Sequence, residues 1–292
     1  MVEQRVAQPR SYLEIPREWE QVGVRHVGAF VTSETFRRPD GRLVTWSSRV
    51  HRKRGRGSFS GSTWWAPHAL AWWIGVLFIV GSACFAVGAL PGYLAWVGYE
   101  ADALTFFVGS LFFTSAALLQ HIEVAVAPRT AGTVERSVGP PRLGIEPRRI
   151  DWWAVAVQLV GTVYFNTTTF AALAHDLDAQ QARRLIWTPD ALGSICFLVA
   201  SELAFAEVGH RLVSWMPRRR DWQITALNMA GSIAFGASAI GSFVLPKTGA
   251  PASVWLTNMG TLVGAVCFLV GAVLLLYERT DAADAPETAT RA

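Results

Sequence analysis

Cysteine is scarce in this chain, and its few copies lie where no disulfide framework could use them. Only Cys84, Cys196 and Cys267 occur in 292 residues, and each falls inside a long apolar stretch. Small secreted domains instead carry dense, paired cysteines that bridge their loops. We therefore expect the three thiols to serve as small apolar packing residues.

Charge is also scarce, at 16% of the residues, and is nearly absent from six apolar stretches. These stretches cover residues 69–90, 103–123, 152–174, 188–209, 222–246 and 253–277. A helix of about 20 residues crosses the roughly 30 Å of hydrocarbon in a bilayer. Six soluble helices this apolar would have no face for water. The sequence thus predicts an all-α transmembrane fold, a six-helix bundle.

Familiar catalytic and cofactor motifs are missing as well. The chain has no nucleophile–base pattern, phosphate loop, nucleotide fingerprint, Cys-x-x-Cys or His-x-x-x-His. His68, His121 and His210 lie near span ends, and no two of them share a span at matched depth. We therefore expect no enzyme activity, no cofactor and no metal.

Lysine and arginine are distributed very unevenly between the two sides of the predicted bundle. The first 67 residues, the linkers after spans two and four, and the tail hold 23 of the 26. The three opposite loops hold only Arg183, Arg184 and Lys247. Because basic loops stay on the cytoplasmic side, both termini are predicted to be cytoplasmic. The same bias accounts for the net charge of +4, so this charge does not indicate nucleic-acid binding.

Three pairs of spans repeat two ungapped patterns. In the first helix of each pair, Trp is followed nine residues later by Gly, then Ser or Thr, then Phe: Trp72, Gly81, Ser82, Phe85; Trp152, Gly161, Thr162, Phe165; Trp222, Gly231, Ser232, Phe235. In the second, Gly is followed by Phe and Glu: Gly109, Phe113, Glu123; Gly193, Phe197, Glu207; Gly264, Phe268, Glu278. Self-similarity at fixed spacing is typical of repeat architectures. It predicts three tandem hairpins around a shared axis.

The spacing also predicts how each hairpin packs. At 1.5 Å per residue, the Phe of one helix lies level with the Gly of its antiparallel partner. Membrane helices associate through close approach at small residues, since lipid supplies no hydrophobic drive. We expect Gly81 opposite Phe113 and Phe85 opposite Gly109, with equivalents in the other hairpins.

The spans divide the chain into a cytoplasmic extension (1–67), three hairpins (68–124, 150–210 and 220–279) and a tail (280–292) expected to be disordered. In the extension, apolar and polar residues alternate from Val27 to Thr45 around Asp40-Gly41, which predicts one small β-hairpin. The long linker after span two is rich in Pro and Gly and should be irregular.

A basic run precedes the first span and contains Arg49, Arg52, Lys53, Arg54 and Arg56. It has two interpretations that are compatible with each other. It is a topology signal, or it binds anionic lipid headgroups at the inner face, where each basic residue contributes about 1 kcal/mol.

Four carboxylates are candidates for function. Glu123, Glu207 and Glu278 occupy equivalent inner-boundary positions, either solvated at the interface or forming an acidic ring that attracts cations. Glu202 lies about 7.5 Å deeper than Glu207. Its repeat equivalents are Leu118 and Val273. A carboxylate within a membrane span is costly, which makes Glu202 the stronger candidate.

Amide side chains form the second candidate group. Gln158 and its repeat equivalent Asn228, together with Asn166 and Asn258, lie within predicted spans. They either make interhelical hydrogen bonds, each worth about 1 kcal/mol, or line a polar cavity for a small solute.

Two stretches resemble a known family. WWIGVLFIVGSACF, which contains Trp72, Gly81 and Phe85, and FFVGSLFF, which contains Gly109 and Phe113, resemble the YrhK-like family of bacterial two-helix membrane modules. The resemblance is clearest over residues 72–123, fainter in the other hairpins and absent from residues 1–67. It implies a hairpin architecture in the bacterial inner membrane and brings no activity with it.

Two functions remain open from the sequence. One is transport of a small solute or ion through the shared centre. The other is a non-transporting accessory or scaffold subunit, with a protein partner or a second copy of the chain. A water-accessible cavity reaching Glu202 favours transport, whereas a dry core with an apolar outer groove favours the scaffold.

Overall fold

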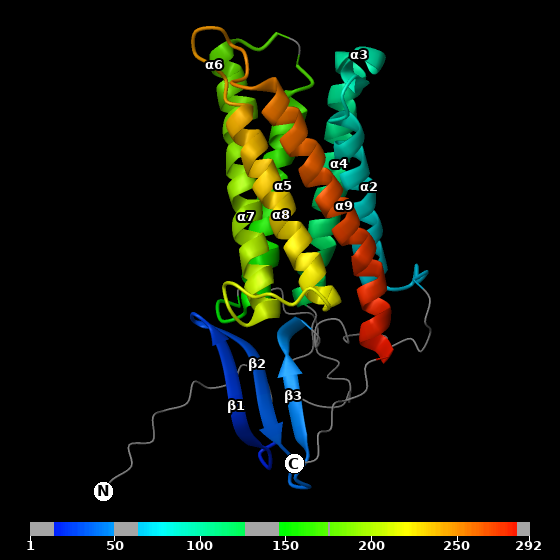
Figure 1. The fold of residues 1–292 in the computed structure, drawn as a ribbon, viewed down its shortest axis with the longest axis vertical. Helices are drawn as coiled ribbons and strands as arrows, with labels where there is room; N and C mark the ends of the chain where they lie inside the picture. Colours follow the sequence, from blue (N-terminus) through cyan, green and yellow to red (C-terminus); the bar gives the residue numbers. More distant parts are fainter. Residues whose placement is uncertain (1–14, 50–63, 126–145, 175, 285–292) are drawn as a thin grey trace, which may run out of the picture.

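The computed structural model describes residues 15–49, 64–125, 146–174 and 176–284, the last seven of these by their backbone only. The chain is mostly helical, with a small antiparallel sheet at one end of the helices (Figure 1). The strands are β1 (Glu20–Val27), β2 (Phe30–Arg37) and β3 (Leu43–Ser47). The helices are α2 (Leu70–Gly88), α3 (Tyr93–Val97), α4 (Tyr99–Ala125), α5 (Ile150–Ala171), α6 (Ala179–Ala182), the π-helix η1 (Arg183–Trp187), α7 (Thr188–Gly209), α8 (Arg220–Gly241) and α9 (Val254–Asp284).

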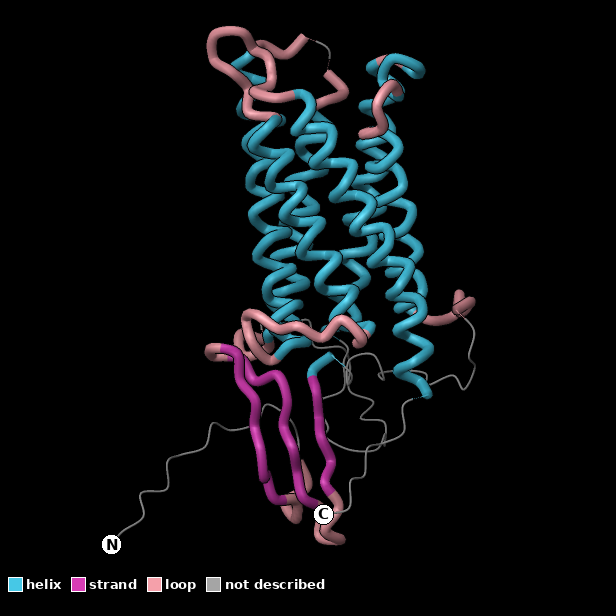
Figure 2. The backbone as a smooth tube through the Cα atoms, viewed as in Figure 1, coloured by secondary structure: helices cyan, strands magenta, loops and turns pink. Residues whose placement is uncertain are grey.

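The six long helices pack side by side in the order in which they occur in the chain. Helices α2 and α4, α5 and α7, and α8 and α9 form antiparallel pairs, and α4 packs on α5 and α7 on α8. Helix α9 then packs against α2, which closes the circuit (Figure 2). The three predicted hairpins are therefore neighbours around one centre.

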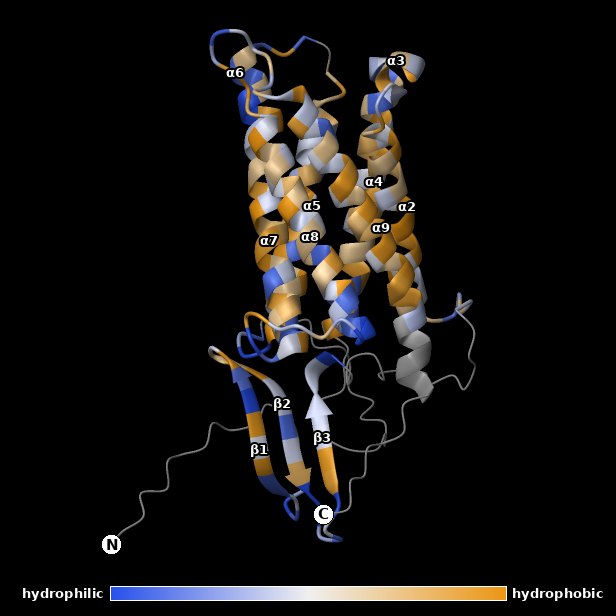
Figure 3. Cartoon of the chain, in the orientation of Figure 1, coloured by the Kyte–Doolittle hydropathy of each residue, from blue (hydrophilic) through white to orange (hydrophobic). Residues whose placement is uncertain are grey.

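Five helical segments are long and apolar enough to cross a membrane: α2, α4, the continuous Ala179–Gly209 segment, α8 and the Val254–Tyr277 part of α9. Many of their apolar side chains face outward, including Leu111, Ile195 and Val263, each about half exposed. Figure 3 shows mostly apolar residues along the helices and a mixture of polar and apolar residues in the sheet. The exposed apolar surface suits lipid contact rather than water.

Helix α5 does not meet the same criterion, although its 22 residues are long enough. Asp151, Gln158, Asn166 and four threonines lower its hydropathy. Five of the six predicted spans therefore meet this criterion among the described residues.

The helices follow the predicted spans with ends that differ by up to five residues, apart from the end of α9, and two features were not expected. The outer loop of the first hairpin contains the short helix α3, which the sequence did not indicate. Helix α9 continues to Asp284, so the expectation of a disordered tail from residue 280 is wrong for its first residues. Alanine-rich sequence favours helix continuation, which explains the extension. The predicted irregular linker falls mostly on residues 126–145, outside the described residues.

The N-terminal extension forms three strands rather than the single predicted hairpin. The expected β2–β3 hairpin turns at Asp40-Gly41, with Gly41 at a φ of 78°. Strand β1 precedes it and pairs antiparallel with β2 through a turn at Gly28, whose φ is 57°. The polar residues and the bulges of β1 interrupt the apolar–polar alternation that is typical of a strand, so the sequence did not predict it. Phe36 and Trp46 form a small core with Ile15 and Trp19.

Each repeat glycine contacts a ring of its partner helix. A methyl group on Gly81 would lie 2.8 Å from Phe113 Cδ2, and one on Gly109 would lie 3.0 Å from Phe85 Cδ2. The second and third hairpins have the same arrangement, with Gly161 against Phe197, Gly193 against Phe165, Gly231 against Phe268 and Gly264 against Phe235. These are the contacts expected from the spacing.

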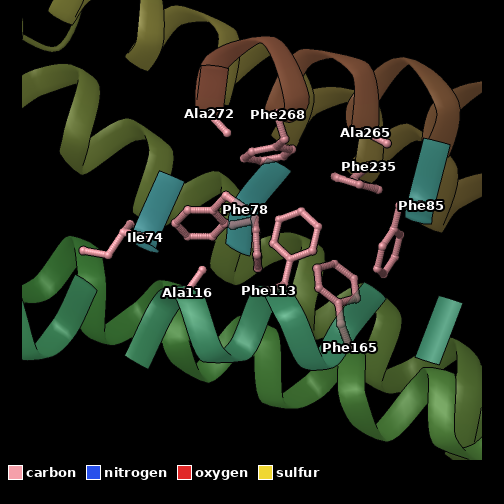
Figure 4. Close-up of a cluster of buried hydrophobic side chains, with 11 residues drawn as sticks. Ile74, Phe78, Phe85, Phe113, Ala116, Phe165, Phe235, Ala265, Phe268 and Ala272 are labelled. Atoms are coloured by element: carbon pink, nitrogen blue, oxygen red, sulfur yellow. The ribbon is translucent and has the colours of Figure 1, made fainter. Parts of the chain in front are cut away.

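The six phenylalanines also converge at the centre of the bundle, one from each long helix (Figure 4). Phe113, Phe197 and Phe268 form a triangle, with ring centroids 6.4, 6.1 and 5.6 Å apart. Phe235 contacts both Phe85 and Phe165 in a second layer. Aromatic pairs at such distances add stabilisation beyond their buried area. The middle of the bundle is thus filled by side chains.

Candidate binding pocket at the inner end of the bundle

A pocket lined by both apolar and polar residues lies at the end of the bundle that faces the sheet. Its cavity volume is about 80 Å³, room for a few water molecules. All six long helices contribute to its wall, and Arg49, just after β3, adds one side chain from the sheet. The polar lining residues are Arg49, Gln120, Glu123, Asp151, Gln158, Glu207, Thr225 and Asn228.

The pocket ends at the aromatic layers. Phe78 and Phe268 form part of its lining, and Phe78 packs on Phe113 with ring centroids 5.7 Å apart. Phe113 and Phe268 are two corners of the central triangle. The cavity therefore stops at the middle of the bundle.

Asp151 is the most deeply buried carboxylate of the pocket. Its side chain is 1% exposed and forms a two-pronged ion pair with Arg149, with N–O distances of 3.0 and 2.7 Å. Arg149 also donates to the Val124 carbonyl at 3.1 Å and to Glu146 at 3.2 Å. A buried carboxylate with a planar guanidinium partner is well compensated. Asp151 is thus part of a rigid network joining the end of α4 to the start of α5.

Glu207 lies on α7 and is also buried. Its carboxylate accepts a short hydrogen bond from the Ser48 hydroxyl, which follows β3. Glu123, on α4, is half-buried and lines the same cavity. Together with Asp151, these two are the carboxylates that line the cavity among the described residues, and Arg49 is the basic residue that lines it.

Amide groups complete the wall. Gln120 Oε1 is buried and has no hydrogen-bond partner among the described residues. Asn228 Oδ1 lies close to the α9 backbone, 2.9 Å from where a methyl group on Gly271 would be. Buried polar atoms are nearly always hydrogen-bonded. The Gln120 oxygen, which lacks a partner among the described residues, is therefore available as an acceptor to a molecule in the pocket.

Polar contacts hold the sheet on the bundle beside this pocket. Thr32 Oγ1 of β2 lies 2.8 Å from His210 Nδ1, directly after α7. Burial lowers the pKa of His210 below its usual range, and the charges of Arg25 and Arg219 lower it further, against an opposing effect of Asp221. Arg49, Ser48 and Glu34 are buried at or near the same junction. Two hydrogen bonds thus join the sheet to the end of α7 that lies next to it.

Only some of the candidate acids and amides named from the sequence line the pocket. Of the candidate acids, Glu123 and Glu207 line the pocket, whereas the Glu278 side chain lies outside the described residues. Of the candidate amides, Gln158 and Asn228 line it. Asn166 and Asn258 do not, since both lie toward the outer end of the bundle.

Glu202 does not face the pocket. Glu202 is partly exposed on α7. Its side chain projects from the helix about 200° away from that of the lining residue Ala204, and on the same side as the exposed Ile195 and Val199. Its repeat equivalents, Leu118 and Val273, are both exposed. The deepest carboxylate of the chain therefore lies on the outer surface of the bundle.

Three polar pocket residues on the helices were missed by the sequence analysis: Gln120, Asp151 and Thr225. A signal for Asp151 was present, because Arg-x-Asp-Trp occurs at Arg149–Trp152 and again at Arg219–Trp222. The first hairpin has Ala69 and Ala71 at these positions, and Ala71 lines the pocket. Arg49, which the sequence grouped with the basic run before the first span, is instead buried and lines the pocket, because the sheet places it there.

The lipid-binding candidates Arg52, Lys53, Arg54 and Arg56 lie outside the described residues. Within residues that the structure describes, no group of three His, Cys, Asp or Glu residues is arranged to hold a metal ion. No family model, no curated protein and no solved structure matches this chain.

Proposed function

We propose that the chain is a six-span protein of the bacterial inner membrane with both termini in the cytoplasm. The five apolar segments and the basic residues beside the sheet support this topology. Helix α5 would be the sixth span, because it packs between α4 and α7 and is as long as α8. Protease protection of N- and C-terminal tags in inside-out vesicles tests it: both tags should be cleaved. Cleavage of only one tag would mean an odd number of spans.

We further propose that the protein binds a small polar ligand in the inner pocket and does not conduct it. The observation that carries this function is the phenylalanine triangle, which closes the bundle axis at the end of a charged cavity. A pocket of this kind suits an accessory or scaffold subunit that responds to a ligand at the inner face. Glu202 and the apolar outer surface of α7 would then be available to a membrane partner.

Transport is the competing function, and it requires the triangle to open. In proteoliposomes, the protein should give no flux of small cations or neutral solutes above that of empty vesicles. Flux that is abolished by Glu207→Gln would favour transport instead. Glu202→Gln should change nothing in this assay, since Glu202 lies on the opposite side of α7 from the pocket.

Native mass spectrometry of the protein in lipid nanodiscs tests ligand binding directly. The wild-type protein should carry a small-molecule adduct, and Glu207→Gln should lose it because the mutation removes a pocket charge. Glu202→Gln is the matched control and should keep the adduct. An adduct that both variants retain, or no adduct in any sample, would remove this pocket from the proposed function.

Two further proposals concern ancestry and lipid. We propose that the hairpins derive from a YrhK-like module, which the glycine–phenylalanine contacts support as architecture alone. We also propose that the basic run before the first span binds anionic lipid headgroups at the inner face.

A further inference from the structure

Glu202 lies on a line of exposed apolar side chains that runs along the outer side of α7. Leu192, Ile195 and Val199 precede it on this line at steps of three or four residues, and each is at least 40% exposed. Residues so spaced lie on the same side of a helix. Glu202 is itself partly exposed. Its carboxylate therefore shares the surroundings of these three apolar side chains and does not face the pocket.

The other two hairpins show which residues suit this position. Leu118 of α4 and Val273 of α9 are the repeat equivalents of Glu202, and both are exposed. Each continues a line of the same kind, since the exposed Leu111 precedes Leu118 on α4 and the exposed Val266 precedes Val273 on α9. An apolar residue thus suffices for the fold at this position. The carboxylate of Glu202 is an addition that the hairpin does not need.

Glu202 makes no hydrogen bond and no ion pair within the part of the chain that the structure describes. Glu207, which lies nearer the inner end of α7, instead accepts a hydrogen bond from Ser48. In the proposed topology Glu202 lies about 7.5 Å deeper than Glu207, within the hydrocarbon. An ionised carboxylate without a partner is costly at such a depth. A counter-charge supplied by another molecule would remove this cost.

The charge of Glu202 distinguishes between possible occupants of this surface. A second copy packed symmetrically through α7 would bring its own Glu202 toward this one, because a twofold interface uses the same patch on both subunits. Two ionised carboxylates in contact repel each other. A lysine or arginine on a helix of another protein would attract Glu202, and the pair would compensate both charges inside the membrane. A basic partner helix therefore fits this surface better than a second copy.

We propose that the outer side of α7 docks a transmembrane helix of another protein, and that a lysine or arginine of this helix pairs with Glu202. The inference rests on the proposed accessory function and specifies the chemistry of its membrane partner. The basic residue of the partner would lie about five residues inside the inner boundary, level with Glu202. Ile195 and Val199 would pack against apolar residues of the same helix.

Fluorescence energy transfer between the labelled full-length protein and labelled synthetic helices in phosphatidylcholine vesicles tests this pairing. One probe is a polyleucine span with a single lysine about five residues from one end, and the other has leucine at that position. The wild-type protein should bind the lysine probe with an association constant about fivefold or more above that of the leucine probe, the size expected of an interhelical polar contact. Glu202→Leu, which gives α7 the residue of α4, should remove this preference. Leu118→Ala is the matched control at the equivalent exposed position and should keep it.

Equal binding of the two probes to the wild-type protein, or a preference that Glu202→Leu retains, would overturn the proposal. Thermal unfolding should show Glu202→Leu to be at least as stable as wild type, since the variant loses a costly carboxylate. Energy transfer between two labelled copies of the protein is the second measurement. Self-association that Glu202→Leu abolishes would make this face an interface between copies and would also reject the proposal. A lysine preference without the pocket adduct would reject the ligand-binding function alone, and the adduct without the preference would reject only this partner.

Discussion

At the scale of single residues, the contact that every hairpin repeats is a glycine facing a phenylalanine ring. The spacing in the sequence was enough to predict it, because antiparallel helices with a fixed rise bring those positions to the same depth. The convergence of all six rings on one axis was not predictable from spacing within a hairpin. It depends on how the three hairpins turn toward each other.

Gly81→Ala should destabilise the first hairpin by about 1–3 kcal/mol, a typical effect of overpacking. The added methyl group would lie 2.8 Å from the Phe113 ring and 3.0 Å from the Gly109 carbonyl oxygen, and a backbone atom cannot move aside as a side chain can. Thermal unfolding in detergent measures the effect.

Gly236→Ala is the matched control for this substitution. Gly236 is also helical, but a methyl group there would meet only Leu198 Cδ1 at 3.4 Å, an ordinary contact. It should be neutral or slightly stabilising, since alanine favours helix over glycine. Equal losses for the two variants would show that the ring contact is not the cause.

At the scale of elements, helices α5 and α8 begin with the same local structure. Arg149 pairs with Asp151 before Trp152, and Arg219 pairs with Asp221 before Trp222. The surroundings differ: Arg149 and Asp151 are 8% and 1% exposed, whereas Arg219 and Asp221 are 49% and 20% exposed. Sequence alone gives the pairing, but burial is set by the end of α4, which covers only the first pair.

Arg149→Ala should therefore cost about 3–5 kcal/mol, because it leaves Asp151 buried without its guanidinium partner. Arg219→Ala breaks the equivalent exposed pair and should cost under about 1 kcal/mol. Chemical unfolding of both variants in detergent gives the comparison. Similar losses of unfolding free energy in the two variants would mean that the burial of Asp151 does not determine how much its ion pair stabilises the protein.

At the scale of the whole molecule, the sheet and the bundle meet through residues far apart in the chain. Ser48 and Glu207 are 159 positions apart, and Thr32 and His210 are 178 apart. No local pattern encodes such contacts, which is why Arg49 was not expected in the pocket. Its helix residues Glu123, Glu207, Gln158 and Asn228 follow from the repeat, whereas Arg49 does not.

Docking of the sheet should weaken as the pH falls below about 6.5, the ordinary pKa of histidine. Burial, and then the charges of Arg25 and Arg219, lower the pKa of His210 and favour its neutral form, against an opposing effect of Asp221. The undocked imidazole binds protons more readily. The contribution of His210 to docking is therefore fully present above about pH 6.5 and is lost as the pH falls from there through the lowered pKa of the docked state.

Pulsed electron resonance between spin labels at Arg42→Cys and Leu212→Cys measures this change. Arg42 lies on the far turn of the sheet, and Leu212 is exposed just after α7. The distance distribution should broaden between pH 7.5 and pH 5.5. His210→Gln, which cannot gain a charge in this range, should abolish the change; a response that persists would point to another group.

The closure of α9 onto α2 has a consequence for biosynthesis. The last long helix to leave the ribosome is the neighbour of the first, and it supplies Phe268, the third corner of the triangle. Until α9 is inserted, the first two hairpins lie in the bilayer without the helix that packs between α8 and α2, and without Phe268 at the centre. A chain truncated before residue 254 should therefore be degraded by quality-control proteases and should not form a smaller functional protein.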